Sequence, residues 1–308
     1  MSLNIVFMGT PEFSLPTLQT LIKNKFNILN AYTQPPKKSK RGQKFNPSPI
    51  EKFCKENNIS FKNPTNLDNE EELKIFKKLS PDIVVVVAYG QIIPKYFLNL
   101  PKFGFINIHA SLLPKWRGAA PIQRSIMNLE KQSGISIMRI KETLDTGDIC
   151  NSYPLDILEN ENAESLSNRL SLLASEKILN DIDDILENRA VFKSQEESKA
   201  TYAKKILKSE GRIDWNNKAE NIVGKVNGLY PNPAAWFIFK GERYKILEAK
   251  IGHNHGDHGI VLNDNLEIGC KDKSIQIISI QREGKTPKKV KEFILGSSIK
   301  KGANLNNA

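Results

Sequence analysis

The first two thirds of the chain alternate short apolar segments with amphipathic ones, and this alternation restricts the possible folds more than any other feature. Ile83–Ala88 is uniformly apolar and mostly β-branched, as expected of a strand buried on both faces of a parallel sheet. Phe13–Ile22 instead places its apolar residues at helical spacing. The pattern predicts an α/β fold with an open, mostly parallel sheet and helices on both faces. The expected strands are Asn4–Met8, Ile28–Thr33, Ile83–Ala88, Gly104–His109 and Gly134–Ile140, and the expected helices are Phe13–Ile22, Pro49–Asn57, Glu70–Leu79, Pro121–Leu129 and Ala163–Leu186.

The pattern changes after residue 188. The stretch that follows is polar and predicts a linker over residues 189–206. A helix at Ala219–Asn227 then precedes several short strands separated by Gly and Pro, which is typical of a small β-barrel, with an OB-like fold as one option. We therefore expect one domain over residues 1–188 and a second over residues 207–308. The strands expected in the second domain are Ala235–Phe239, Tyr244–Ile251, Gly259–Leu262, Leu266–Cys270 and Ile275–Gln281.

The chain is basic, with a formal net charge of +11. Such an excess favours a polyanionic partner bound through phosphate groups, although a Lys-rich surface without such a partner is the alternative. About half of the excess lies in residues 207–308, which hold 17 basic and 11 acidic residues. Gln34–Ile50 is also basic, with Lys38, Lys40, Arg41 and no acid, and fits a solvated surface loop and a binding loop equally well.

The sequence carries no targeting or membrane signal. Its N-terminus lacks the cationic start and long apolar stretch of a signal peptide, and the apolar run Ile83–Ala88 is far shorter than a membrane span. Cys54, Cys150 and Cys270 are far apart and form no C-x-x-C pair, so each is expected to be a buried filler residue in a reduced compartment. We expect a cytoplasmic protein.

Asn107 and His109 are the strongest candidates for a catalytic role. They lie two residues apart in an expected strand, so their side chains point to the same face of the sheet. His109 also ends that strand, and ligands of open α/β sheets bind beyond the carboxyl ends of the strands. Burying polar groups in an apolar strand is unfavourable, which a functional site would explain; a hydrogen-bonded structural histidine is the alternative.

Asp145 lies in the polar turn Asp145–Asp148, which turn formation alone would explain. Together with Asn107 and His109, however, it completes a set suited to acyl transfer. An imidazole moves protons near neutral pH, an amide donates a hydrogen bond to a developing oxyanion, and a carboxylate orients the imidazole. No Ser or Cys nucleophile is required if the attacking amine belongs to the substrate.

Other motifs argue against alternative chemistries. Met8–Phe13 follows a strand and opens a helix, but it has a single glycine where nicotinamide-binding turns have G-x-G-x-x-G. No G-x-x-x-x-G-K-[ST] phosphate-binding loop occurs in the sequence. His253, His255 and His258 form a histidine-rich segment whose spacing matches no established zinc pattern, so we expect a turn and no metal site.

Several motifs taken together resemble the methionyl-tRNA formyltransferase family. They are Met8–Phe13, Ala88–Gln91, Asn107–Pro114, Arg117–Pro121 and Asp145–Asp148, followed by Thr201–Ala203, Arg212–Trp215 and Gln281–Gly284. The resemblance covers nearly the whole chain, and Asn107–Pro114 is the segment most specific for folate-dependent formyltransferases.

The resemblance implies a Rossmann-like formyltransferase catalytic domain over residues 1–188 and an OB-like tRNA-binding domain over residues 207–308, in a monomeric protein. The formyl donor would be 10-formyltetrahydrofolate, and the acceptor would be the amine of methionyl initiator tRNA. Asn107, His109 and Asp145 match the catalytic positions of the family. Folate would bind at Tyr89, Gly90, Ser111, Leu112, Leu113 and Pro114, and the acceptor end of the tRNA would meet the loop that carries Lys38, Lys40 and Arg41.

Three alternatives remain at this point. A formyltransferase for a small amine, such as a nucleotide-linked amino sugar or glycinamide ribonucleotide, would share the three catalytic residues. A formyl-folate hydrolase would share them too. A non-catalytic RNA-binding protein built on an OB-like module would need none of them.

Overall fold

A computed structural model describes residues 3–39 and 44–306 of the chain. By its internal contacts the chain divides into two compact units. The first unit comprises residues 1–119, 133–155 and 167–203, and the second comprises residues 120–132, 156–166 and 204–308. Among the helices of the described residues, none is both long and apolar enough to cross a membrane.

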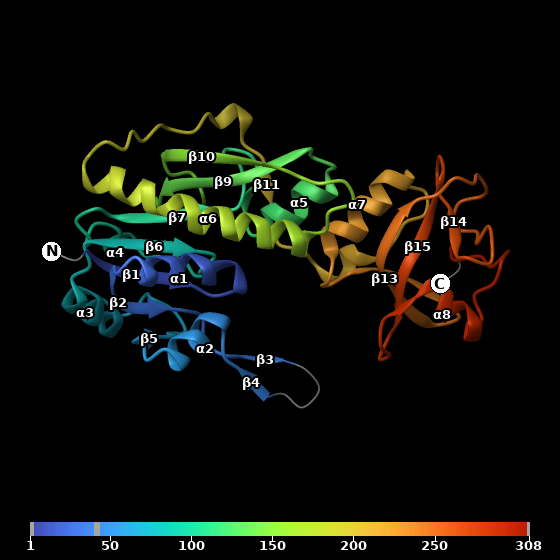
Figure 1. The fold of residues 1–308 in the computed structure, drawn as a ribbon, viewed down its shortest axis with the longest axis horizontal. Coiled ribbons are helices and arrows are strands. Elements are labelled where there is room, and N and C mark those ends of the chain that lie inside the picture. The colour runs from blue at the N-terminus through green and yellow to red at the C-terminus, as the bar shows by residue number, and fades with distance from the viewer. Residues whose placement is uncertain (1–2, 40–43, 307–308) are drawn as a thin grey trace. The chain divides into compact units, whose positions relative to one another are not determined.

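In the described part of the first unit, seven strands form one sheet in the order β10-β9-β7-β6-β1-β2-β5 (Figure 1). Neighbouring strands from β5 to β7 run parallel, and β9 runs antiparallel to β7. The predicted mostly parallel sheet is therefore confirmed. Its strands are β1 (Asn4–Gly9), β2 (Asn27–Tyr32), β5 (Phe61–Lys62), β6 (Ile83–Val87), β7 (Phe105–His109), β9 (Gln132–Arg139) and β10 (Ile149–Asp156).

Apolar side chains cover both faces of this sheet because successive strand residues point to opposite sides. On one face, Met8 and Val86 pack with Phe76 of α3 (Glu70–Leu79) and Phe97 of α4 (Lys95–Leu98). Phe105 of β7 belongs to the same cluster. The later residues of β7 at intervals of two therefore emerge on this face, beyond the apolar cluster.

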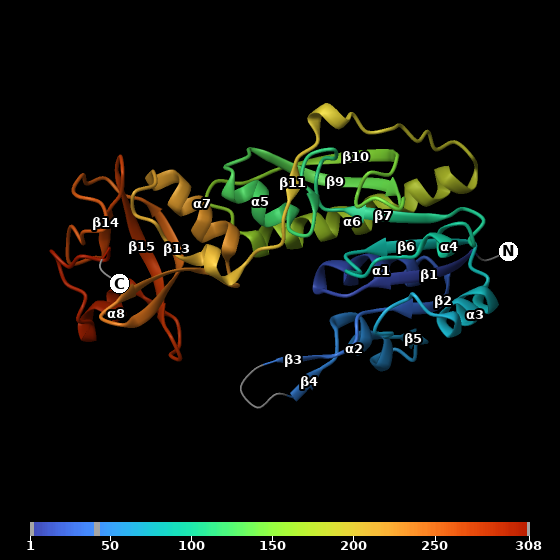
Figure 2. The same cartoon turned by 180° about the vertical axis from the view of Figure 1, so that it is seen from behind.

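The other face is covered by α1 (Leu15–Lys23) and α6 (Ala163–Leu186). Both helices lie on the near side of the sheet in Figure 1, and α6 lies behind the strands in Figure 2. Ser171 of α6 donates a hydrogen bond of 2.7 Å from Oγ to the Phe13 carbonyl, which ties α6 to the chain just before α1. Helices on both faces were predicted and are confirmed.

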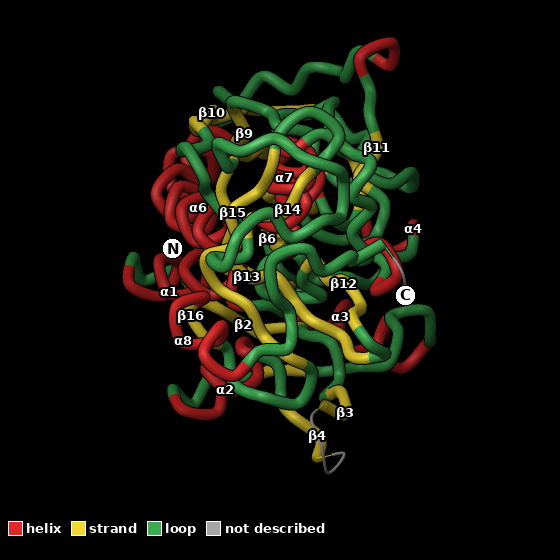
Figure 3. The backbone as a smooth tube through the Cα atoms, turned by 90° about the vertical axis from the view of Figure 1, so that its right-hand side faces the viewer, coloured by secondary structure: helices red, strands yellow, loops and turns green. Residues whose placement is uncertain are grey.

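The segment Gln34–Ile50, predicted as a loop, contains a short antiparallel hairpin. Its strands are β3 (Lys37–Ser39) and β4 (Lys44–Asn46), with Lys38 opposite Phe45. The hairpin extends beyond α2 (Pro49–Glu56), as Figures 1 and 3 show. Strands of three residues are too short to show an alternation of apolar and polar side chains, so local sequence patterns do not predict them. Lys40 and Arg41 lie outside the described residues.

The second unit contains an antiparallel sheet, which confirms the predicted series of short strands in this part. Within residues 204–306 the strand order is β12-β13-β15-β14, with β16 also paired to β15. Ile222 and Val226 of α7 (Ala219–Leu229) pack into the core of this sheet with Phe237 and Ile246. The predicted strand Gly259–Leu262 is reduced to isolated bridges at Ile260 and Val261. The strands are β12 (Ala235–Phe239), β13 (Glu242–Ile251), β14 (Glu267–Gly269), β15 (Ser274–Arg282) and β16 (Lys288–Lys289). The unit also contains the helices α5 (Pro121–Met127) and α8 (Val290–Phe293).

Candidate active site

β7 places Asn107 and His109 at the carboxyl edge of the parallel strands. The strand is held between β6 and β9, with Asn107 opposite Val86 on one side and His109 opposite Ser136 on the other. His109 is buried, and its Nε2 lies 2.9 Å from the Trp116 carbonyl oxygen. Because a carbonyl only accepts hydrogen bonds, Nε2 carries the donated hydrogen. Asn107 is half-buried, and none of the described residues hydrogen bonds to its side chain.

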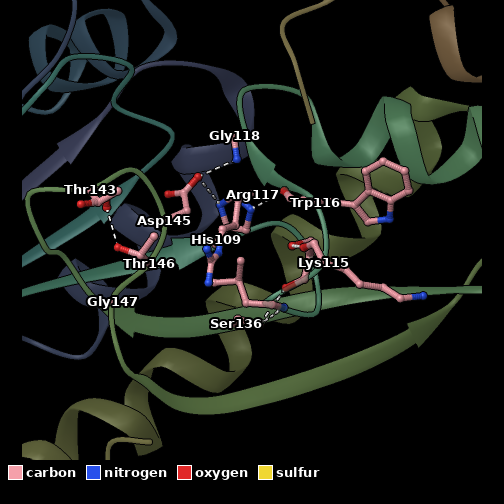
Figure 4. Close-up of polar contacts among 12 residues, drawn as sticks. His109, Lys115, Trp116, Arg117, Gly118, Ser136, Thr143, Asp145, Thr146 and Gly147 are labelled. Carbon is pink, nitrogen blue, oxygen red and sulfur yellow. Dashed lines mark hydrogen bonds and ion pairs between the residues drawn. The ribbon is translucent and has the colours of Figure 1, made fainter. Parts of the chain in front are cut away.

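The turn between β9 and β10 brings Asp145 to the same point. Asp145 Oδ2 lies 3.6 Å from His109 Nδ1 and accepts a 2.8 Å hydrogen bond from the Gly118 N–H (Figure 4). The Asp145 side chain is only 12% exposed, so its charge is poorly screened by solvent. Both ring nitrogens of His109 therefore face a protein oxygen, Trp116 O at Nε2 and the carboxylate at Nδ1. The sequence predicted the two side chains but not the main-chain groups of Trp116 and Gly118.

The segment from Ser111 to Pro114, predicted to bind folate, follows His109 and is anchored to β9. Ser136 Oγ donates to the Ser111 carbonyl at 2.8 Å and accepts from the Leu113 N–H at 3.0 Å. Ser111 is buried, and its hydroxyl donates to the Lys115 carbonyl at 2.6 Å. The half-buried residues of this segment are Leu112 and Pro114. The segment thus offers apolar surface and a fixed backbone rather than a free Ser111 hydroxyl.

Tyr89 and Gly90, also predicted to bind folate, follow β6 at the same edge of the sheet. Their carbonyls accept hydrogen bonds from Gln34 Nε2 at 3.1 and 2.7 Å, and the Tyr89 carbonyl also accepts from Thr10 Oγ1 at 2.8 Å. The Tyr89 ring is buried in the apolar cluster, and this burial, with the nearby charge of Glu72, raises the pKa of its phenol. Tyr89 is therefore a neutral hydrogen-bonding group at physiological pH.

The residues predicted to contact tRNA lie in the hairpin region. The backbone of Lys38 belongs to β3, whereas Lys40 and Arg41 fall outside the residues that the structure describes. A second basic surface lies in the second unit. A groove of about 620 Å³ there is lined by four exposed basic residues, Lys240, Arg282, Lys285 and Lys288. Two acids, Glu242 and Glu292, lie in the same groove, and Glu242 forms an ion pair with Arg282.

No cysteine is activated as a nucleophile. Burial raises the pKa of Cys54 to about 11, and burial with nearby Asp181 and Asp184 raises that of Cys150 to about 11. Burial raises the pKa of Cys270 to about 12. All three thiols are therefore protonated at neutral pH.

The histidine-rich segment of the second unit forms a turn built around a carboxylate. Glu267 accepts hydrogen bonds from the main-chain N–H groups of His253 and Asn254, both at 2.9 Å. His255 Nδ1 lies 3.0 Å from the Asp272 carbonyl. Among the described side chains, no three His, Cys, Asp or Glu residues are grouped so that they could hold a metal ion.

Comparison with known proteins gives matches along the chain. Residues 3–182 match the family model described as formyl transferase, and residues 205–298 match the model described as formyl transferase, C-terminal domain. The methionyl-tRNA formyltransferase of Pelagibacter ubique (strain HTCC1062) is 57% identical over 309 residues, with 100% of both chains covered. That of Bradyrhizobium diazoefficiens is 40% identical over 308 residues, covering 98% of this chain and 99% of the relative.

The fold also matches a solved structure. The N-formyltransferase from Helicobacter canadensis, crystallised in complex with folinic acid and dTDP-3-aminofucose, superposes with a TM-score of 0.69. The superposition covers 92% of this chain and 100% of the other, at 18% sequence identity. At this identity the likeness concerns the fold.

Proposed function

The chain belongs to the formyl transferase family, among its methionyl-tRNA formyltransferases, and we propose that it transfers the formyl group of 10-formyltetrahydrofolate to the free amino group of methionyl initiator tRNA, which allows translation to begin. The observation that carries the proposal is the approach of Asp145 to His109 beside Asn107 at the carboxyl edge of the sheet. This arrangement suits attack of a substrate amine on a formyl carbon. It requires no nucleophile from the protein.

The three side chains divide the chemistry of the transfer. The neutral methionyl amine attacks the formyl carbon, which forms the new C–N bond and places negative charge on the formyl oxygen. Asn107 stabilises this oxyanion by donating a hydrogen bond, and protonated His109 stabilises it through its positive charge. Asp145 holds the imidazole and stabilises that charge. The intermediate then collapses with cleavage of the bond to folate N10, while the proton lost by the amine reaches N10. The unused hydrogen-bonding capacity of Asn107 supports its role toward the substrate.

We assign folate binding to the surfaces around the catalytic residues. The half-buried Leu112 and Pro114 supply apolar contact, and Tyr89 and Gly90 border the same edge of the sheet. We assign catalysis to residues 1–188 and tRNA binding to the loop around Arg41 and to residues 207–308. The basic groove lined by Lys240, Arg282, Lys285 and Lys288 supports the latter assignment, since RNA presents a continuous line of phosphates.

Two alternatives are less well supported. A formyltransferase for a small amine would share the three catalytic residues but would not need a basic groove in the second unit. A non-catalytic RNA-binding protein would need neither two polar residues at the end of a buried strand nor the approach of Asp145 to His109.

The test is to incubate the purified chain with 10-formyltetrahydrofolate and methionyl initiator tRNA, and to look for formylmethionine by mass spectrometry after hydrolysis of the ester. Parallel reactions replace the tRNA with a nucleotide-linked amino sugar or with glycinamide ribonucleotide. Formylmethionine from the wild-type protein, formed at least about 100-fold more slowly by His109→Ala, is the expected result. Formylation of a small amine without formylation of the tRNA, or tRNA binding without any transfer, would overturn the proposal.

A further inference from the structure

The residues that flank His109 and Asp145 are held by a segment far along the chain. We call residues 193–203, which follow α6, the strap. Within the first unit, β11 (Tyr202–Ala203) of the strap pairs in parallel with β8 (Arg117–Gly118). Thr201 accepts hydrogen bonds from the N–H groups of Trp116 and Arg117, through Oγ1 and the carbonyl respectively, both at 2.9 Å. The main-chain groups of Trp116 and Gly118 that contact His109 and Asp145 therefore lie in a segment that is hydrogen bonded to the strap.

Gln195 of the strap also holds the other side of the site. Its Nε2 donates to the carbonyls of Asp145 and Gly147, both at 2.8 Å, and its Oε1 accepts from Arg117 Nε at 3.0 Å. Both amide hydrogens and the amide oxygen of Gln195 are therefore used on the turn that carries Asp145 and on Arg117. Gln195 is half-buried, whereas its neighbours Ser194 and Glu196 are exposed.

The Asp145 turn needs such support because of its backbone conformation. Asp145 has φ of 53°, in the left-handed region, which residues with a side chain adopt much less often than glycine, although aspartate adopts it more readily than most. A residue persists there when the surrounding structure constrains it, and such residues concentrate at functional sites. The two hydrogen bonds from Gln195 to the carbonyls of Asp145 and Gly147 supply this constraint.

Arg117 fixes Gln195 in turn. Its side chain is 1% exposed, and its Nη1 lies 2.9 Å from each carboxylate oxygen of Glu197. Its Nη2 is buried and has no hydrogen-bond partner among the residues that the structure describes. A buried guanidinium with an unpaired nitrogen is a poor contributor to stability, since an apolar residue of similar size would serve better. The hydrogen bond from Arg117 to Gln195 instead fixes the orientation of the Gln195 amide.

We propose that Gln195 is a positioning residue for formyl transfer: it holds the Asp145 turn so that the carboxylate reaches His109, and Arg117 orients the Gln195 amide. The proposal rests on the proposed function, because it assigns Gln195 to the same site. It predicts that Gln195 acts only through Asp145. Loss of the Gln195 hydrogen bonds should therefore lower kcat and leave the KM values for folate and tRNA nearly unchanged.

The experiment compares Gln195→Met, which keeps the size of the side chain and removes its hydrogen bonds, with Ser198→Ala. Ser198 is a matched control because it lies on the strap and its hydroxyl donates, within residues 3–39 and 44–306, only to Glu196 Oε1. We expect kcat to fall on the order of 10- to 100-fold in Gln195→Met, since misplacement by about 1 Å has effects of this size. Ser198→Ala should retain wild-type kcat.

A double-mutant cycle with Asp145→Asn separates positioning from general destabilisation. If Gln195 acts through Asp145, adding Gln195→Met to Asp145→Asn should cause no further loss of kcat. Multiplicative losses in the double variant, or a fall in kcat that tracks the unfolding temperature, would overturn the proposal.

A readout independent of activity distinguishes failure of this inference from failure of the proposed function. The Gly118 amide donates to Asp145 Oδ2, so its hydrogen exchange measures whether the carboxylate is in place. Exchange at Gly118, measured by NMR, should be faster in Gln195→Met than in wild type and unchanged in Ser198→Ala. Unchanged exchange in Gln195→Met would contradict the inference even if the wild-type protein formylates tRNA, and accelerated exchange would support it even if no transfer is detected.

Discussion

His109 illustrates how a single residue depends on main-chain groups that have no sequence signature. Its Nε2 hydrogen bonds to the carbonyl of Trp116, and its Nδ1 faces the carboxylate of Asp145 at 3.6 Å. The carboxylate is in turn held by the Gly118 N–H. The ring orientation is therefore set from both sides, and the imidazole can stabilise charge without first reorganising.

Removing either member of this pair should affect turnover more than binding. His109→Ala and Asp145→Asn are each expected to lower kcat by about 10²–10⁴, because each removes general acid–base or electrostatic help. Dissociation constants for folate, measured by fluorescence or calorimetry, should change little. A large loss of folate binding with unchanged kcat would contradict the roles assigned to these residues.

Glu267 is a second residue whose hydrogen bonds allow a prediction, here of how the stability of the fold depends on pH. Its burial alone would raise its pKa, but hydrogen bonds from Ser274 Oγ and from Asn254 and His253 outweigh this effect and lower it to about 2. The folded-state pKa lies below the ordinary value, so the ionised carboxylate stabilises the fold fully above about pH 4.5, and this contribution is lost as the pH falls toward 2. Glu267→Gln should lower the free energy of unfolding by about 2–3 kcal/mol at neutral pH.

The pH dependence of that difference checks the assignment. Urea unfolding of wild type and Glu267→Gln should show a gap that narrows as the pH falls from about 5 to about 2, because protonation removes the charge in the wild type as well. A gap that stays constant over this range would mean that the charge of Glu267 is not what stabilises the histidine-rich turn.

At the scale of elements, the segment that carries the hairpin β3–β4 begins and ends at two residues that are hydrogen bonded to each other, Thr33 and Ser48. Ser48 caps α2 by accepting from the Glu51 N–H at 3.0 Å, and its hydroxyl lies 2.6 Å from that of Thr33, which follows β2. The two ends of the hairpin segment are thus held together by one pair of hydroxyls. Both residues are buried.

Ser48→Ala is expected to lower the free energy of unfolding by about 1–2 kcal/mol, because it removes the cap and leaves the buried Thr33 hydroxyl without this partner. Asn69→Ala is the matched control, since Asn69 Oδ1 caps α3 by accepting from Glu72 N–H at an exposed site. Asn69→Ala should lower the free energy of unfolding by less than Ser48→Ala does, on the order of 1 kcal/mol or less. Equal losses in urea denaturation would show that the Thr33–Ser48 contact contributes nothing beyond the cap.

At the scale of the whole molecule, net charge is the property that matters for an RNA partner. The chain carries +11, and the exposed basic groove of the second unit belongs to the part that holds about half of this excess. Binding through phosphates releases counterions, so affinity falls steeply with salt.

The dissociation constant for initiator tRNA, measured by filter binding, is expected to rise by at least about tenfold between roughly 50 and 200 mM salt. Replacing Lys285 and Lys288 by Gln should weaken binding and reduce the steepness of the salt dependence. The KM for 10-formyltetrahydrofolate should stay nearly constant in this variant. An affinity for tRNA that does not vary with salt would contradict binding through phosphates.

Much of this protein followed from local patterns in the sequence. Alternation of strand and helix patterns predicted the parallel sheet, and the two-residue period of a strand placed Asn107 and His109 on one face. Local patterns did not predict correctly which of the short segments form strands. The hairpin β3–β4 was therefore predicted as a loop, and Gly259–Leu262 was predicted as a strand but is reduced to bridges.

The sequence by itself determined which side chains are available for the chemistry and on which face of the sheet two of them emerge. Only the tertiary structure decided that Asp145 meets His109. It also decided that Gln195 hydrogen bonds to the turn that carries Asp145, and that Arg117 hydrogen bonds to Gln195. The physical reason is that these contacts join segments distant in the sequence, and that the turn is held in part through main-chain groups, the carbonyls of Asp145 and Gly147 and the N–H of Gly118. Every residue except proline carries both groups, so the spacing of residue types contains no information about which of them will pair.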